Sequence, residues 1–150
     1  MDFIKGLFDM DFGSLVPEMD TILGIIRPLL TLLLLAGPIA LLTLGLLYLF
    51  KAPKEANYKF GFRTYYGMGS TEAWQFTQKI AGLAYGGLGA LLLIIMIIVT
   101  ICFGGKNAYQ MASTAITCLL WQVGLVLAAH LTVAILARMY FNADGSRRKE

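Results

Sequence analysis

The chain has 150 residues, of which 58% are hydrophobic and 14% are charged, and its formal net charge is +3. A soluble globular domain is closer to about 45–50% apolar, so a mean hydropathy of +0.72 excludes an ordinary soluble domain. The basic residues form no cluster larger than Arg147–Lys149. This excludes an extended basic surface for DNA or RNA, and we expect no nucleic-acid partner.

Residues 1–26 are predicted to form an amphipathic N-terminal segment. Apolar side chains recur at helical spacing, with acidic residues between them, at Phe3, Leu7, Leu15 and Met19. This pattern is typical of a helix that lies on a membrane surface. Because its polar face is acidic, a helix that binds a partner protein is the alternative. The basic start of a cleaved signal peptide is missing, so we expect an uncleaved first span.

Three uncharged runs follow, at residues 28–50, 80–105 and 107–137. Each run exceeds the roughly 20 residues that a helix needs to cross the hydrocarbon core of a bilayer. The chain is therefore predicted to be an all-α integral membrane protein with three transmembrane helices, and its first partner is the lipid bilayer. The membrane domain is expected at 27–141, with spans at about 28–50, 80–105 and 112–137, a polar loop at 51–79 and a basic tail at 142–150.

The basic residues predict the orientation of these spans. Nine of the 12 Lys and Arg residues lie in the polar loop or near the C-terminus, which share one side of the membrane if there are three spans. Lys and Arg are enriched in cytoplasmic segments. We therefore expect the N-terminus outside, and the polar loop and the C-terminus in the cytoplasm.

The first two spans contain residues that shape helix packing. Proline removes a backbone donor, so Gly37–Pro38 predicts a kink in the first span. In the second span, Gly82, Gly86 and Ala90 place small side chains on one face. Such a face lets helix backbones approach closely, which favours packing against another span or against a second copy in a homo-oligomer.

The third span contains two polar side chains, Gln122 and His130. An ionisable group inside a membrane is a candidate functional residue, although both side chains could simply bond to a neighbouring helix. Cys102 and Cys118 flank the turn between spans two and three and could form a disulfide or remain free thiols. The sequence has no set of catalytic residues and no metal-binding cluster. We therefore expect no enzyme, cofactor or metal.

The polar loop holds most of the chain's remaining chemistry. Between Asn57 and Thr64 apolar and polar residues alternate, which predicts an extended piece on the membrane surface. After the following turn, Ser70 or Thr71 could cap a helix with Glu72 in its first turn. Arg63 could pair with Glu72, stack on Trp74 or Tyr65, or bind a lipid phosphate.

Three elements of this loop resemble a known family. They are GFRT at 61–64, STEAW at 70–74 and QKIAG at 78–82. The positions that carry the resemblance are Asn57, four residues before the first element, and within the elements Gly61, Arg63, Thr64, Ser70, Glu72, Trp74, Lys79 and Gly82. Their order and spacing resemble those of the SdpI family of bacterial membrane proteins, over roughly residues 53–137. The chain departs from the family pattern at Tyr65, where proline is frequent, and at Gln78, where asparagine is usual.

The resemblance implies a small multi-helix domain in a bacterial cell membrane. For the founding member it also implies immunity to a secreted peptide toxin, and signalling by holding a transcriptional repressor at the membrane. We therefore expect a peptide toxin or a cytoplasmic regulator as partner. The alternatives are an accessory subunit that associates through the Gly82, Gly86 and Ala90 face, and a small ligand or proton transport component that uses His130, Gln122 and Arg63.

Overall fold

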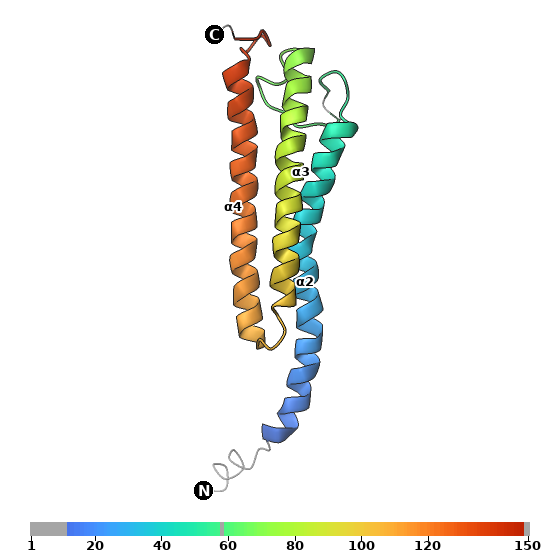
Figure 1. Cartoon of the computed structure of the whole chain (residues 1–150), viewed down its shortest axis with the longest axis vertical. Coiled ribbons are helices and arrows are strands. Elements are labelled where there is room, and N and C mark those ends of the chain that lie inside the picture. The colour runs from blue at the N-terminus through green and yellow to red at the C-terminus, as the bar shows by residue number, and fades with distance from the viewer. Residues whose placement is uncertain (1–11, 58, 149–150) are drawn as a thin grey trace.

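The computed structural model describes residues 12–57 and 59–148, with side chains from residue 22 onward. This part of the chain forms three helices, α2 (Phe12–Phe50), α3 (Thr71–Ile101) and α4 (Ala108–Tyr140). Figure 1 shows the three helices side by side, with the polar loop and the C-terminus at one end and the N-terminus at the other. All three are long and apolar enough to cross a membrane. The predicted all-α membrane fold with three spans is confirmed.

The first helix is longer than the span predicted for it. Part of the predicted amphipathic segment, residues 1–11, lies outside the described residues, and from Phe12 onward the chain is already in α2. The helix continues through Pro38 as one element (Figure 1). Within the residues whose side chains are described, Ile22–Phe50 is long and apolar enough to span a membrane. The helix therefore runs without a break across residue 26, where the predicted amphipathic segment ends.

Local sequence explains where the other two helices begin and end. Ser70 caps α3, because its hydroxyl accepts a hydrogen bond from the Ala73 amide at 3.1 Å. Asn107 and Gln110 form a capping box at the start of α4. Between these two helices, α3 ends at Ile101 rather than at residue 105, and the chain turns through Gly105, whose φ of +79° suits glycine.

Helices α2 and α3 make the closest helix contact in the bundle. A side chain on Gly45 of α2 would collide with the backbone of Gly86, and a Cβ on Gly82 would come within 2.5 Å of Leu49. The small-residue face predicted on α3 therefore packs against α2 within the same chain. Of its three predicted members, Gly82 and Gly86 make this contact, and Ala90 is half-buried one turn further along.

Helix α4 is held more loosely, and a polar side chain ties it to α2. The buried Gln122 donates a hydrogen bond from Nε2 to the Leu34 carbonyl at 3.1 Å. Pro38 follows Leu34 by four residues and has no N–H, so this carbonyl lacks its usual helical donor. Gln122 supplies the missing hydrogen bond from another helix.

The outer faces of the helices are strongly apolar. Leu32, Ile101, Leu120 and Trp121 are each about two-thirds exposed or more. In water such a surface would be a liability, whereas lipid tails solvate it well. The exposed apolar residues therefore fit a bundle that is surrounded by a bilayer.

Candidate functional site: the polar loop and its pocket

The polar loop is built around Trp74, which is fully buried at the start of α3. Its indole Nε1 donates a hydrogen bond to the Pro53 carbonyl at 2.8 Å, which fixes the beginning of the loop. Gly61 lies against the same ring with a φ of +127°, and a Cβ at this position would be 2.5 Å from the ring carbons. The spacing between GFRT and STEAW thus places a glycine where the tryptophan leaves no room for a side chain.

Gln78 holds the middle of the loop through the backbone of Phe62. Its Oε1 accepts from the Phe62 amide at 2.8 Å, and its Nε2 donates to the Phe62 carbonyl at 2.7 Å. Both groups are buried, so the two hydrogen bonds satisfy backbone atoms that would otherwise be costly to bury. Sequence reasoning treated Gln78 only as a departure from the family pattern. A polar residue one turn after Trp74, on the same helix face, was the signal that could have identified it.

Phe62 extends from the loop into the space between the helices. Its ring centroid lies 6.2 Å from that of Tyr48 on α2, 5.7 Å from that of Tyr85 on α3 and 4.8 Å from that of His130 on α4. The Tyr85 hydroxyl and His130 Nδ1 are 3.1 Å apart and share a hydrogen bond. The intramembrane histidine therefore has a partner on another helix, and one loop side chain contacts all three helices.

Two residues shape the rest of the loop as turns. Asn57 Oδ1 accepts hydrogen bonds from the backbone amides of Lys59 and Phe60, each at 3.0 Å. Thr64 accepts from Gly67 N through its hydroxyl and from Met68 N through its carbonyl. The alternation of residues predicted an extended piece between Asn57 and Thr64. This prediction is wrong at the start of the piece, because the Asn57 side chain turns the backbone there.

The C-terminal tail folds back onto this loop. The Ser70 hydroxyl donates to the Gly145 carbonyl at 2.7 Å, while the Glu72 carboxylate lies 3.8 Å from the Arg147 guanidinium. The tail itself is a short hairpin in which the backbone N–H of Asn142 donates to the Ser146 carbonyl. Hydrogen bonds from Ser146 to the Asp144 carboxylate lower the pKa of Asp144 below its usual range. Residues 142–148 of the predicted basic tail thus form one structure with the loop.

The remaining charged residues of the motif lie on the surface. The side chains of Arg63 and Lys79 are exposed, and Glu72 is exposed beside Arg147. The motif therefore separates into an internal set, Gly61, Trp74 and Gln78, and an external set of charges. The internal set holds the loop in place, and the external set lies on the surface of the molecule.

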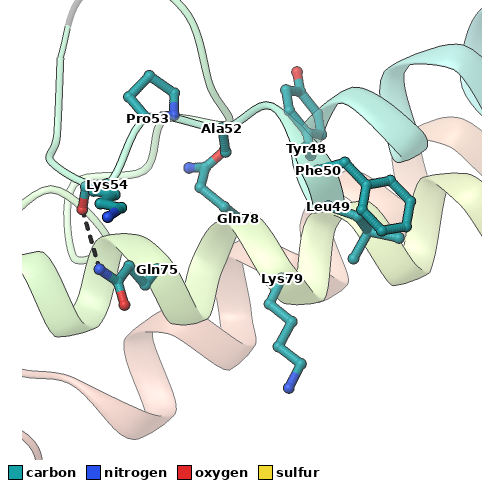
Figure 2. A pocket seen from close by; sticks show the side chains of 9 residues that line it. All are labelled: Tyr48, Leu49, Phe50, Ala52, Pro53, Lys54, Gln75, Gln78 and Lys79. Atoms are coloured by element: carbon teal, nitrogen blue, oxygen red, sulfur yellow. Dashed lines mark hydrogen bonds between the residues drawn. The ribbon is translucent and has the colours of Figure 1, made fainter.

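A pocket of about 590 Å³ opens between the end of α2 and the start of α3 (Figure 2). Its apolar side is formed by the last residues of α2, and its polar side by the loop and the first turns of α3. The lining residues are Tyr48, Leu49, Phe50, Ala52, Pro53, Lys54, Gln75, Gln78 and Lys79. In Figure 2, Gln75 donates to the Lys54 carbonyl, a hydrogen bond of 3.3 Å that closes one end of the pocket.

The other predicted residues are not brought into this pocket. Gln122 lies between α2 and α4, and Gly82 and Gly86 lie at the α2–α3 contact. Cys102 and Cys118 are free thiols. In the described part of the chain, no three His, Cys, Asp or Glu residues gather as metal ligands.

Comparison with known proteins finds one family. The model of the SdpI/YfhL protein family matches residues 54–140, which is more than half of the chain. The matched segment contains the whole loop motif, four of the nine residues that line the pocket, and both α3 and α4. Comparisons with curated proteins and with solved structures gave no match.

Proposed function

The chain belongs to the SdpI/YfhL protein family, and from that premise we propose that it is an immunity-type or signalling protein of the bacterial cell membrane. In this role the three helices respond to an amphipathic peptide in the membrane. The polar loop, on the cytoplasmic side, passes the response to a regulator.

The contact of Phe62 with all three helices carries this proposal. Its ring packs against Tyr48, Tyr85 and His130, one from each helix. A peptide that changes the distance between two helices would therefore change the packing of the loop. Because Gln78 holds the backbone of Phe62 on both sides, movement of the ring would also move the loop.

The surface of the loop and tail supports a partner on the same side. Arg63 and Arg147 are exposed there, and arginine is well suited to protein recognition because its planar guanidinium can bind carboxylates in pairs of hydrogen bonds. If the basic loop faces the cytoplasm, this surface meets a regulator. It does not meet a peptide that arrives from outside.

The alternative functions lack a comparable observation. The Gly82 and Gly86 face is occupied by α2, so it does not present itself to another subunit. His130 is bonded to Tyr85, which suits a structural link between helices as well as a transport site.

The proposal is tested by survival of a bacterium that is sensitive to a membrane-active peptide. Cells would express the wild-type chain, Phe62→Leu or Tyr65→Ala, and immunoblots of the membrane fraction would establish equal amounts. We expect protection from the wild type and from Tyr65→Ala, whose side chain is 75% exposed. Protection should be reduced by Phe62→Leu, which preserves apolar volume but removes the ring contacts.

Two results would contradict the proposal. One is a wild-type protein that is present in the membrane at normal levels but gives neither protection nor any change in transcription on peptide challenge. The other is equal protection by wild type and Phe62→Leu, which would show that the loop contact plays no part in the response.

A further inference from the structure

We propose that the pocket between α2 and α3 binds the phosphate headgroup of an anionic phospholipid. The pocket lies where α2, a membrane-spanning helix, ends at Phe50 and the polar loop begins. This is the level at which lipid headgroups meet the protein. A phospholipid headgroup is therefore within reach of the pocket when the protein is inserted.

The two sides of the pocket match the two parts of a phospholipid. The apolar side includes Leu49 and Phe50, and Phe50 is 76% exposed, so it can pack along an acyl chain. The polar side includes Lys54 and Lys79, which are both exposed. An ammonium group binds phosphate as a compact point charge with three donors.

The charge of the lining favours an anion. Two lysines and no acidic residue line the pocket. Among the residues that the structure describes, neither lysine forms an ion pair, since the single pair found is between Glu72 and Arg147. A phosphate would therefore not have to displace a carboxylate.

Three other polar groups of the pocket are already bonded within the protein. The Pro53 carbonyl accepts from Trp74, the Lys54 carbonyl accepts from Gln75, and the Gln78 amide is bonded to Phe62 at both ends. The two lysine ammonium groups are the charged donors of the lining that remain for a ligand. This excess of donors favours a phosphate over a ligand that must itself donate hydrogen bonds.

Two neighbouring residues on α3 have different roles: Gln78 binds the loop, and Lys79 lies at the rim of the pocket. Figure 2 shows Gln78 pointing toward the loop, while Lys79 extends away from it on a flexible side chain. Lys79 can therefore move toward a headgroup without disturbing the Gln78–Phe62 hydrogen bonds. The inference does not depend on the proposed function, because lipid binding requires neither a peptide nor a regulator.

The test is lipid binding by the full chain, purified in a neutral detergent and stripped of lipid. Phosphatidylglycerol, phosphatidylcholine and inorganic phosphate would each be titrated while native mass spectrometry and thermal unfolding are recorded. We expect tight binding and a raised Tm with phosphatidylglycerol only. A basic residue near an anionic lipid surface contributes about 5-fold in affinity, so Lys54→Gln/Lys79→Gln should weaken binding roughly 30-fold.

Two variants control for charge and for folding. Lys59→Gln/Arg148→Gln removes the same charge from exposed residues outside the pocket, and it should bind phosphatidylglycerol like the wild type. Lys54→Arg/Lys79→Arg preserves the charge and should retain most of the binding. Equal binding of both phospholipids, equal losses in the two glutamine variants, or binding of inorganic phosphate as tight as that of the lipid would each overturn the proposal.

Discussion

At the scale of single residues, Gly61 shows most clearly why the loop motif needs particular side chains. Its φ of +127° is a conformation that other residues rarely adopt, and its Cα faces the ring of Trp74. Two independent constraints therefore require glycine. Trp74 in turn needs the Pro53 carbonyl as the acceptor for its buried N–H.

We predict that Gly61→Ala destabilises the protein by about 2 kcal/mol or more, because the methyl group adds backbone strain and a clash with Trp74. Thermal unfolding in detergent measures the loss. Gly87→Ala is the matched control, since no atom lies within 4 Å of a Cβ at this helical position. It should leave the Tm unchanged or raise it. A Tm that falls equally in both variants would contradict the account of Gly61.

At the scale of elements, the helices are joined by two different kinds of contact. Helices α2 and α3 approach closely because glycines face each other, which gains van der Waals contact in a medium where apolar burial gives little. Helix α4 is joined to α2 by Gln122, which bonds to the carbonyl left open by Pro38. The proline and the glutamine are therefore coupled, although they lie on different helices.

We predict that Gln122→Leu destabilises the bundle by about 1–2 kcal/mol, because the Leu34 carbonyl loses its donor. Adding Pro38→Ala restores a backbone N–H that can bond to this carbonyl within α2. The double variant should therefore lose less stability than the sum of the two single variants, which a double-mutant cycle of unfolding free energies measures. Strict additivity would show that Gln122 and Pro38 act independently.

At the scale of the whole molecule, polar contacts between distant segments gather, among the residues that the structure describes, at the end of the bundle that carries the loop and the tail. The loop, the start of α3 and the C-terminal hairpin are linked by Trp74, Gln78 and Ser70 (Figure 1). The opposite end has the turn between α3 and α4 and the N-terminal part of α2. A signal between the two ends has to travel through the helices, and Phe62 lies where they meet the loop.

We predict that the polar loop and the C-terminus face the cytoplasm, because nine of the 12 Lys and Arg residues lie at that end of the chain's spans. A green fluorescent protein fused after residue 150 should fluoresce, and alkaline phosphatase fused after Gly105 should be active. The control exchanges the two reporters, so that the phosphatase follows residue 150 and the fluorescent protein follows Gly105; neither should then be active. An active phosphatase at the C-terminus would mean that the orientation is reversed.

Several features could be predicted from the sequence because they depend on local composition. Hydropathy and the length of the apolar runs predicted the three helices. Ser70 or Thr71 as a cap, with Glu72 in the first turn, predicted where α3 begins. The loop motif named Gly61 and Trp74 as separate positions, and only the structure shows that they lie against each other. The pairing suggested between Arg63 and Glu72 did not anticipate Arg147, which lies 3.8 Å from Glu72, because the tail was predicted as a separate basic segment.

The sequence by itself determined that this chain spans a membrane three times and carries its chemistry in one loop, because bilayer thickness selects apolar runs of a fixed length. Only the tertiary structure decided which residues meet. Gln78 bonds to Phe62 across 16 positions, Ser70 to Gly145 across 75, and Gln122 to Leu34 across 88. Such contacts depend on how each helix is rotated and how closely its neighbours approach, and neither quantity is contained in the hydropathy of a single segment.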